Sequence, residues 1–360
     1  MSEVVDLNVR RAGVLLHITS LPSPFAQGVL GIEALRFIDS IKSGGYKVWQ
    51  FLPLGPTHDH GSPYESLSSS AGNEKLIDLR GCVAENWLDE IDLAAFLADE
   101  AKQAEQFHGL LDKASAVFWQ QVLENDALAA ELCVFKAENA SWLDDYALFV
   151  ALKQCQEGKA WWQWTDTLRD HDADALGLVR ELQENAIKNV VFKQFLFARQ
   201  WQVIKDYAKA QGVLLFGDLP IYVAHDSADV WANRQYFTVN EEGYCQEVAG
   251  VPPDYFSETG QRWGNPLYKW DKLAEDGFAW WVERVRTQMQ RMDMLRIDHF
   301  RGLEAFWVIP ADRDDGMVGE WRKADGDALL QALKQAFGSL PIIAEDLGLI
   351  TDEVHALRKK

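Results

Sequence analysis

Three short apolar runs of this sequence each end in an acidic residue. They cover residues 212–218, 294–298 and 341–345, and their last residues are Asp218, Asp298 and Glu345. Apolar runs of this length are typical of strands that are buried on both faces of a parallel sheet. A parallel α/β barrel places its catalytic groups at the C-terminal ends of its strands. The runs therefore predict an α/β fold with carboxylates gathered at one end of the sheet.

Two further strands are predicted near the N-terminus, at residues 13–21 and 48–54, with a helix at 32–43 between them. Strand, helix and strand at this spacing form a βαβ unit. We therefore expect a (β/α)8 barrel of the TIM type. Residues 1–65 would hold its strands 1 and 2, and residues 211–360 its strands 3 to 5.

Residues 66–210 carry a different pattern. From about residue 88 their apolar positions recur at intervals of three and four, which predicts helices. No fixed repeat length emerges, so we expect one large, mostly helical insertion after strand 2. Later, the Gly- and Pro-rich residues 250–266 predict a long loop on the side where barrels keep their active sites.

The sequence stops at Lys360, soon after a helix start at Thr351. Five strands do not close an eight-stranded barrel, so we expect the C-terminal barrel strands to be absent. An open sheet edge and an uncovered interior favour aggregation or pairing with another chain. We therefore expect these 360 residues alone to be poorly active.

The charge balance narrows the class of partner. With 35 basic and 55 acidic residues the net charge is −20, which argues against nucleic-acid binding and favours a neutral substrate. No apolar run of 18 residues is present, and the N-terminus lacks the basic and apolar regions of a signal peptide. We expect no membrane partner and a cytoplasmic location.

Motifs for metals and cofactors are missing from the sequence. The four cysteines are scattered, so we expect reduced and mostly buried thiols. His58 and His60 have no further convergent ligands, so we expect no metal there. Glycine-rich nucleotide motifs, HExxH and GxSxG do not occur. We expect no cofactor.

Asp298 and Glu345 are the candidate catalytic pair. One Asp and one Glu on adjacent strand ends suit retaining cleavage of a glycosidic bond, in which the carboxyls lie about 5 Å apart. Asp298 would be the nucleophile, held ionised by Arg296 two residues earlier, and Glu345 the acid/base. Alternatively, strand-end acids only cap the following helices or pair with basic loops.

Other candidate residues surround this pair. Asp218 either holds substrate hydroxyls or forms a structural salt bridge with Arg296. Tyr64 and Trp263 lie in Gly- and Pro-rich segments, where a large aromatic ring is either a sugar platform or part of the core. His299 is either a donor to a sugar hydroxyl or a packed histidine.

Several longer motifs resemble those of the 4-α-glucanotransferase family, also called amylomaltases or disproportionating enzymes. The similarity runs from about Gly13 to the last residue. The motifs are Gly61-Ser-Pro-Tyr64, Gly217-Asp-Leu-Pro-Ile-Tyr-Val223, Asp226-Ser-Ala-Asp-Val-Trp231, the loop from Val251-Pro-Pro-Asp254 to Gln261-Arg-Trp-Gly-Asn-Pro266, Leu295-Arg-Ile-Asp-His-Phe-Arg-Gly302 and Ala344-Glu-Asp-Leu-Gly348.

The resemblance implies an α-amylase-superfamily barrel with helical insertions. Such enzymes transfer α-1,4-glucan segments between maltooligosaccharides without a cofactor. By position, Asp298 matches the family's nucleophile and Glu345 its acid/base. Trp263 would lie in a loop that shields the glycosyl-enzyme from water and so favours transfer. The substrate-binding positions of the family are matched by Tyr64, Asp218, Trp263, Arg296 and His299.

The chain departs from the family in one catalytic feature. A third carboxylate, in a late Thr-His-Asp-Asn stretch, has no counterpart, and Thr57-His58-Asp59 follows the second predicted strand instead. Two alternative functions therefore stay open. One is an α-amylase-type glucan hydrolase, and the other is a non-catalytic α-glucan-binding protein.

Overall fold

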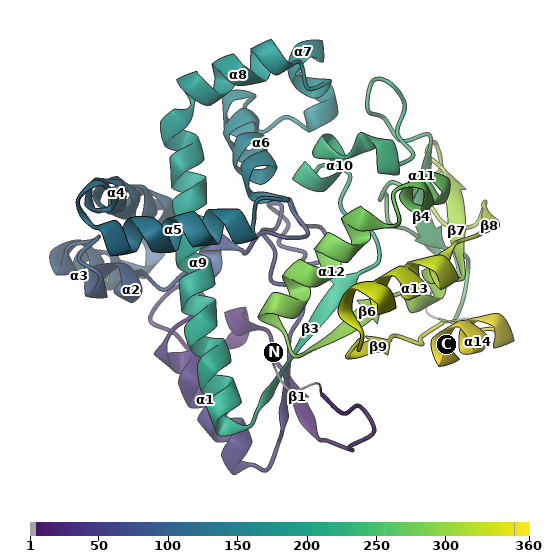
Figure 1. Cartoon of the computed structure of the whole chain (residues 1–360), viewed down its shortest axis with the longest axis horizontal. Helices are drawn as coiled ribbons and strands as arrows, with labels where there is room; N and C mark the ends of the chain where they lie inside the picture. The colour runs from purple at the N-terminus through teal and green to yellow at the C-terminus, as the bar shows by residue number, and fades with distance from the viewer. Residues whose placement is uncertain (1–4, 256, 349) are drawn as a thin grey trace.

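The computed structural model, which describes residues 5–255, 257–348 and 350–360, is organised around a five-stranded parallel sheet (Figure 1). Its strand order is β1-β2-β3-β6-β9, and every neighbouring pair is parallel. The strands are β1 (Gly13–Leu15), β2 (Val48–Gln50), β3 (Leu214–Pro220), β6 (Met294–Asp298) and β9 (Ile342–Ala344).

All five predicted strands therefore belong to one parallel sheet, and the α/β class is confirmed. The first two are shorter than predicted, because the chain turns into a short 3-10 helix at Ile18–Ser20 and leaves the sheet after Gln50. Within the described residues β1 and β9 are not paired with each other, so the structure shows a parallel sheet and not a closed barrel.

Helices occupy most of the chain between β2 and β3 and cover the sheet elsewhere. Of the predicted helices, α1 lies at 32–43 as expected. The helices are α1 (Ile32–Ser43), α2 (Leu79–Ala84), α3 (Glu90–Ala98), α4 (Gln103–Glu124), α5 (Asp126–Glu138), α6 (Leu143–Cys155), α7 (Asp166–Arg169), α8 (Ala173–Leu182), α9 (Glu184–Gln211), α10 (Ala228–Ala232), α11 (Trp270–Glu275), α12 (Ala279–Arg291), α13 (Gly326–Phe337) and α14 (Asp352–Lys359).

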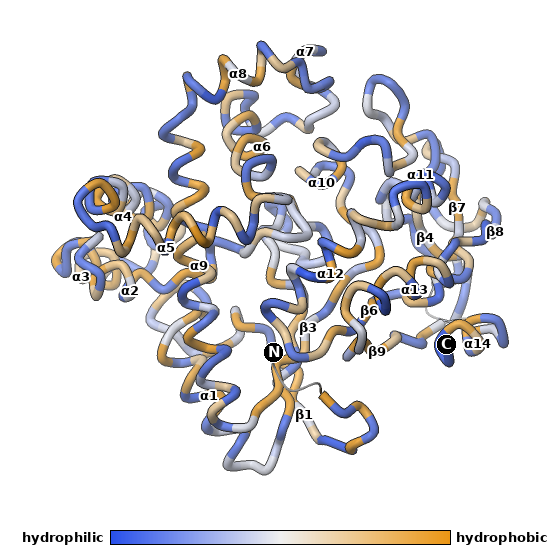
Figure 2. Tube along the Cα trace, viewed as in Figure 1, coloured by the Kyte–Doolittle hydropathy of each residue, from blue (hydrophilic) through white to orange (hydrophobic). Residues whose placement is uncertain are grey.

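Helix α9 connects the helical block to the sheet. In Figure 1 it descends from α8 to the region beside α1 and β1, and it contacts α4 and α6 as well as α1, α12 and β3. Its trace alternates between apolar and polar residues in Figure 2, as expected for an amphipathic helix. Phe192 packs on Trp87 and Phe118 of the helical block, and Trp201 packs on Phe51 beside the sheet. One apolar core therefore continues through both parts.

A second, antiparallel sheet was not predicted. Its order is β5-β4-β7-β8, and its strands are β4 (Glu247–Val251), β5 (Gln261–Arg262), β7 (Ala305–Pro310) and β8 (Glu320–Lys323). The long loop predicted at 250–266 is therefore interrupted, because β4 extends to Val251 and β5 covers Gln261–Arg262. Gly250, which suggested a loop, is required by the sheet, because a Cβ there would lie 2.2 Å from the carbonyl oxygen of Gln261. Phe256, in the same segment, lies outside the described residues.

Two smaller findings concern thiols and membranes. All four cysteines are free, but the expectation of mostly buried thiols is wrong: Cys82 is buried, whereas Cys133 and Cys155 are exposed. The exposed pair lies on α5 and α6, on helix faces that do not pack inward. Across the part of the chain that the structure describes, no helix is long and apolar enough to cross a membrane.

Candidate active site

The register between β3 and β6 brings the central charged residues together. Asp218 pairs with Arg296, and Pro220 with Asp298. Paired residues of parallel strands point to the same face, so the Asp218 and Arg296 side chains meet. Arg296 donates from Nε to Asp218 Oδ1 at 2.8 Å and from Nη2 to Oδ2 at 2.9 Å. The Asp218 side chain is only 1 % exposed, so this two-pronged ion pair is buried.

Arg296 also reaches Asp298, as predicted. Its Nη2 donates to Asp298 Oδ1 at 2.6 Å. Burial, followed by the charge of Asp218, nevertheless raises the pKa of Asp298 to about 6, although Arg296 opposes the shift. That Arg296 holds Asp298 ionised stays a prediction: Arg296 lowers the pKa of Asp298, but burial and Asp218 raise it by more. Asp298 still ionises at neutral pH.

Tyr64 completes the cluster from a separate segment. Its hydroxyl donates to Asp218 Oδ2 at 2.7 Å and accepts from Arg296 Nη2 at 3.3 Å. Burial and the neighbouring Asp218 charge raise the pKa of Tyr64, so the phenol stays protonated and is a hydrogen-bond donor.

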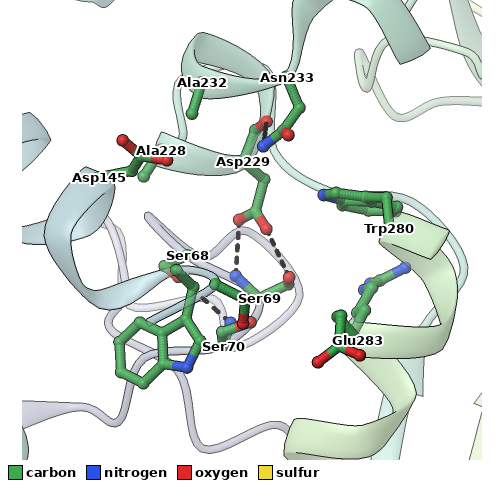
Figure 3. Close-up of a pocket in the computed structure, with 13 residues that line it drawn as sticks. Ser68, Ser69, Ser70, Asp145, Ala228, Asp229, Ala232, Asn233, Trp280 and Glu283 are labelled. Carbon is green, nitrogen blue, oxygen red and sulfur yellow. Dashed lines mark hydrogen bonds between the residues drawn. The ribbon is translucent and has the colours of Figure 1, made fainter. Parts of the chain in front are cut away.

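The segment that carries Tyr64 is held by α10. Asp229 accepts hydrogen bonds from the Ser69 main-chain N–H at 2.7 Å and from Ser69 Oγ at 2.6 Å, as Figure 3 shows. Three residues earlier, Asp226 pairs with Lys153 of α6 at 2.5 Å. The motif Asp226–Trp231 therefore ties the sheet ends both to the Tyr64 segment and to the helical block.

Glu345 follows directly after β9 and is oriented by main-chain groups. Its Oε2 accepts from the His299 N–H at 3.0 Å, and the Leu347 N–H donates to Oε1. His299 adopts a left-handed backbone conformation with φ of 53°. Such a conformation is uncommon for a residue other than glycine and occurs mostly where surrounding structure enforces it. Here it aims the N–H of His299 at Glu345.

The ring of His299 faces Trp263. The two ring centroids lie 4.8 Å apart and the ring planes are at 90° to each other. The main-chain N–H of Trp263 donates to the carbonyl oxygen of Ala249 at 3.0 Å, which holds Trp263 in place. Burial, with a smaller contribution from Arg301, lowers the pKa of His299 to about 4, so the ring is neutral. Its Nε2 is buried and has no hydrogen-bond partner among the described residues.

Arg284 of α12 supports the end of β3. It is buried, and it donates to Pro220 O at 2.6 Å and Ile221 O at 3.1 Å. Its guanidinium lies 4.8 Å from the ring centroid of Trp281. Sequence reasoning missed this residue, although the spacing of Trp280, Trp281 and Arg284 on one helix was a usable signal.

A cavity of about 800 Å³ opens beside the two candidate catalytic acids. Four of the predicted residues line it: Trp263, Asp298, His299 and Glu345. Tyr64 and Asp218 line a separate, small recess. Arg296 touches Tyr64, Asp218 and Asp298, so it links the two groups. The large cavity is also lined by Arg301 and Trp321, which sequence reasoning did not single out.

The arrangement suits acid–base and nucleophilic chemistry on a neutral ligand. One carboxylate is held by an arginine, a second is oriented by main-chain N–H groups, and both face the same cavity. Among residues 5–255, 257–348 and 350–360, no group of three or more His, Cys, Asp and Glu side chains is placed to hold a metal ion.

Comparisons with known proteins give a consistent result. A family model described as 4-alpha-glucanotransferase matches residues 16–360. The 4-alpha-glucanotransferase of Thermus thermophilus is 45 % identical over 98 % of this chain and 70 % of its own length. That of Aquifex aeolicus (strain VF5) is 43 % identical over 98 % of this chain and 72 % of its own length.

A solved structure extends the likeness to the fold. The amylomaltase from Streptococcus agalactiae, in complex with acarbose, matches with a TM-score of 0.91 at 36 % identity. The match covers 97 % of this chain and 72 % of that chain.

Proposed function

Because this chain belongs to the 4-alpha-glucanotransferase family of transferases, we propose that it moves α-1,4-glucan segments between maltooligosaccharides by a retaining double displacement. The observation that carries this mechanism is the shared cavity of Asp298 and Glu345, with Arg296 bound to the first and His299 to the second.

In the first step, an Asp298 carboxylate oxygen attacks the anomeric carbon of the donor. The bond from that carbon to the glycosidic oxygen breaks, and Glu345 gives its proton to the departing oxygen. The products are a glycosyl ester on Asp298 and a shortened glucan. The pKa of about 6 for Asp298 leaves it ionised for this attack at neutral pH.

In the second step, the Glu345 carboxylate takes the proton from the 4-hydroxyl of an acceptor glucan. The acceptor oxygen attacks the anomeric carbon and expels Asp298, which restores both acids and the original anomeric configuration. When water takes the place of the acceptor, the same step is hydrolysis. Exclusion of water therefore decides between transfer and hydrolysis.

The remaining predicted residues would bind the sugar. Tyr64, Asp218 and Arg296 present hydroxyl, carboxylate and guanidinium groups on one side of Asp298. Neutral His299 has an unused ring nitrogen that suits a sugar hydroxyl. Trp263 offers an aromatic face at the cavity, suited to the CH face of a pyranose ring.

We extend the proposal to the architecture. The five parallel strands would be the first five of a (β/α)8 barrel, with strands 1 and 2 in residues 1–65 and strands 3 to 5 in 211–360. Residues 66–210 would be the helical insertion, although α9 packs on both parts. The cytoplasmic location and the low activity expected from the sequence stay predictions.

Incubation with maltotriose tests the function. Transfer yields glucose together with maltotetraose, maltopentaose and longer chains. An α-amylase-type hydrolase yields glucose and maltose only, and a glucan-binding protein yields no products. Either of the last two patterns, from folded protein, would overturn the proposal.

A further inference from the structure

Arg301 is a buried arginine that packs on an aromatic ring but leaves two of its side-chain nitrogens without a hydrogen-bond partner among the described residues. The residue is 6 % exposed, and its Nε and Nη1 have no hydrogen-bond partner among the described residues. Arg296, by contrast, donates to two carboxylates. Arg284, whose Nε is also unpaired among the described residues, donates from both terminal nitrogens to main-chain carbonyls. Leaving charged donors buried and unpaired is unfavourable, and a ligand that accepts hydrogen bonds from them would relieve that cost.

Trp321 of β8 fixes the orientation of Arg301. The guanidinium carbon lies 3.6 Å from the ring centroid of Trp321, which is stacking distance. Trp321 in turn packs its ring against Trp307 of β7, with centroids 5.2 Å apart. At this distance the guanidinium lies over the ring of Trp321, which restricts the orientations open to it. Both residues line the cavity of Asp298 and Glu345.

The chemistry of this pair fits a carbohydrate. A guanidinium offers two neighbouring N–H donors in a fixed fork, which matches the spacing of adjacent hydroxyl oxygens on a pyranose ring. Trp321 is 36 % exposed, which leaves apolar aromatic surface for the CH face of a sugar. The net charge of −20 makes an anionic ligand unfavourable for the protein as a whole.

The position of the pair identifies which sugar it would bind. Arg301 and Trp321 share their cavity with Glu345, whereas Tyr64 and Asp218 line the separate recess. In the proposed mechanism Glu345 acts on the oxygen of the leaving and entering chains, so its cavity is the acceptor side. We propose that Arg301 and Trp321 form an acceptor-binding wall that holds a glucosyl unit of the incoming glucan. This inference rests on the proposed function.

Kinetics with a starch donor and maltose as the varied acceptor test the proposal. In R301M the KM for maltose should rise about tenfold or more, because hydrogen bonds from a charged donor are lost. The ratio of transfer to hydrolysis should fall by a similar factor. R301K should recover part of the loss, and W321A should resemble R301M.

Arg286 provides a matched control. It also stacks on an aromatic ring, 5.1 Å from the centroid of Phe337, but it lies outside the cavity. R286M should leave the acceptor KM and the transfer ratio unchanged. Melting temperatures identify variants that fail to fold, and R301K then replaces R301M as the test, since it keeps the charge and loses the fork.

The outcomes separate this inference from the proposed function. If the wild-type protein transfers glucan and folded R301M and R301K keep its acceptor KM and transfer ratio, the acceptor-binding wall is wrong. If the wild-type protein forms no transfer products, the proposed function is wrong. In that case calorimetric titration with maltotriose decides the inference alone: weaker binding by R301M but not R286M supports it, and equal binding overturns it.

Discussion

The main-chain N–H of His299 donates to Glu345 Oε2 at 3.0 Å, so the residue after the proposed nucleophile orients the proposed acid/base. β6 and β9 pair in parallel, which brings their ends together, and the left-handed turn at His299 supplies the donor. The relative placement of the two acids therefore depends on the backbone more than on flexible side chains. This is the form of preorganisation that catalysis requires.

The rate of transfer should fall on the acid side with an apparent pKa near 6. Asp298 attacks as a carboxylate, and burial raises its pKa to about 6, so protonation removes the nucleophile below that pH. kcat/KM for maltotriose should drop about tenfold for each pH unit below this apparent pKa. A profile that stays flat down to pH 4.5 would contradict the assignment of Asp298.

D298N should be more stable than the wild-type protein at pH 8. An aspartate whose folded pKa is raised holds its proton more tightly in the folded state, so stability falls as pH rises from about 4 to 6. Removing the charge should recover about 1–3 kcal/mol at pH 8, with the difference vanishing near pH 4. Urea unfolding of both proteins at the two pH values measures this difference in the free energy of unfolding. Equal stability at pH 8 would show that the buried charge has no cost.

Gly302 should tolerate no side chain, because the ring of His299 packs where a Cβ of residue 302 would lie. A Cβ at Gly302 would lie 2.7 Å from Ile221 Cδ1 and 3.0 Å from His299 Cδ2. G302A should destabilise the protein by about 1–3 kcal/mol and lower kcat/KM about tenfold or more, because the His299 ring must move.

Gly109 gives the control for this substitution. It lies within α4, where an added Cβ would meet nothing within 4 Å. G109A should stabilise the protein by about 0.5–1 kcal/mol and leave activity unchanged, because alanine favours the helix. Thermal unfolding and maltotriose kinetics on both variants suffice. Wild-type activity in G302A would mean that the position of His299 is unimportant.

E345Q should lose activity on glucans but keep the first step on an activated donor. With maltotriose, kcat should fall about 10²- to 10⁴-fold, because no acid protonates the leaving oxygen. A maltosyl fluoride releases fluoride, which needs no proton, so the initial burst of fluoride should persist. D298N should lose both activities. A fluoride burst in D298N would contradict the role of Asp298 as nucleophile. The absence of a burst in folded E345Q would contradict the role of Glu345 as the acid that protonates the leaving oxygen.

The sequence predicted the parallel sheet well because buried strands and their terminal acids leave a local pattern. The run ending at Asp298 is β6. The run ending at Asp218 is β3, which continues to Pro220, and the run ending at Glu345 contains β9, which ends at Ala344. The antiparallel sheet was missed because its central pairing joins β4 to β7, far along the chain, and because β4 and β5 border a Gly- and Pro-rich segment. Gly250 looked like a loop residue, and only the opposing Gln261 backbone explains it.

Parts of the site depended on three-dimensional context that no motif records. The pKa of Asp298 reflects burial and a third charge, Asp218, on a neighbouring strand. Arg301 belonged to a recognised motif, but the role proposed for it rests on its buried N–H groups and its contact with Trp321, which the motif does not record. Such properties arise from packing between segments that are far apart in the sequence.

The most direct test of the central claim is to trap the covalent intermediate. E345Q would be incubated with a maltosyl fluoride, digested with a protease, and its peptides analysed by mass spectrometry. One maltosyl group is expected, attached as an ester to Asp298 in the peptide that contains β6. A maltosyl group on another residue, or no labelled peptide while fluoride is released, would contradict the proposed double displacement.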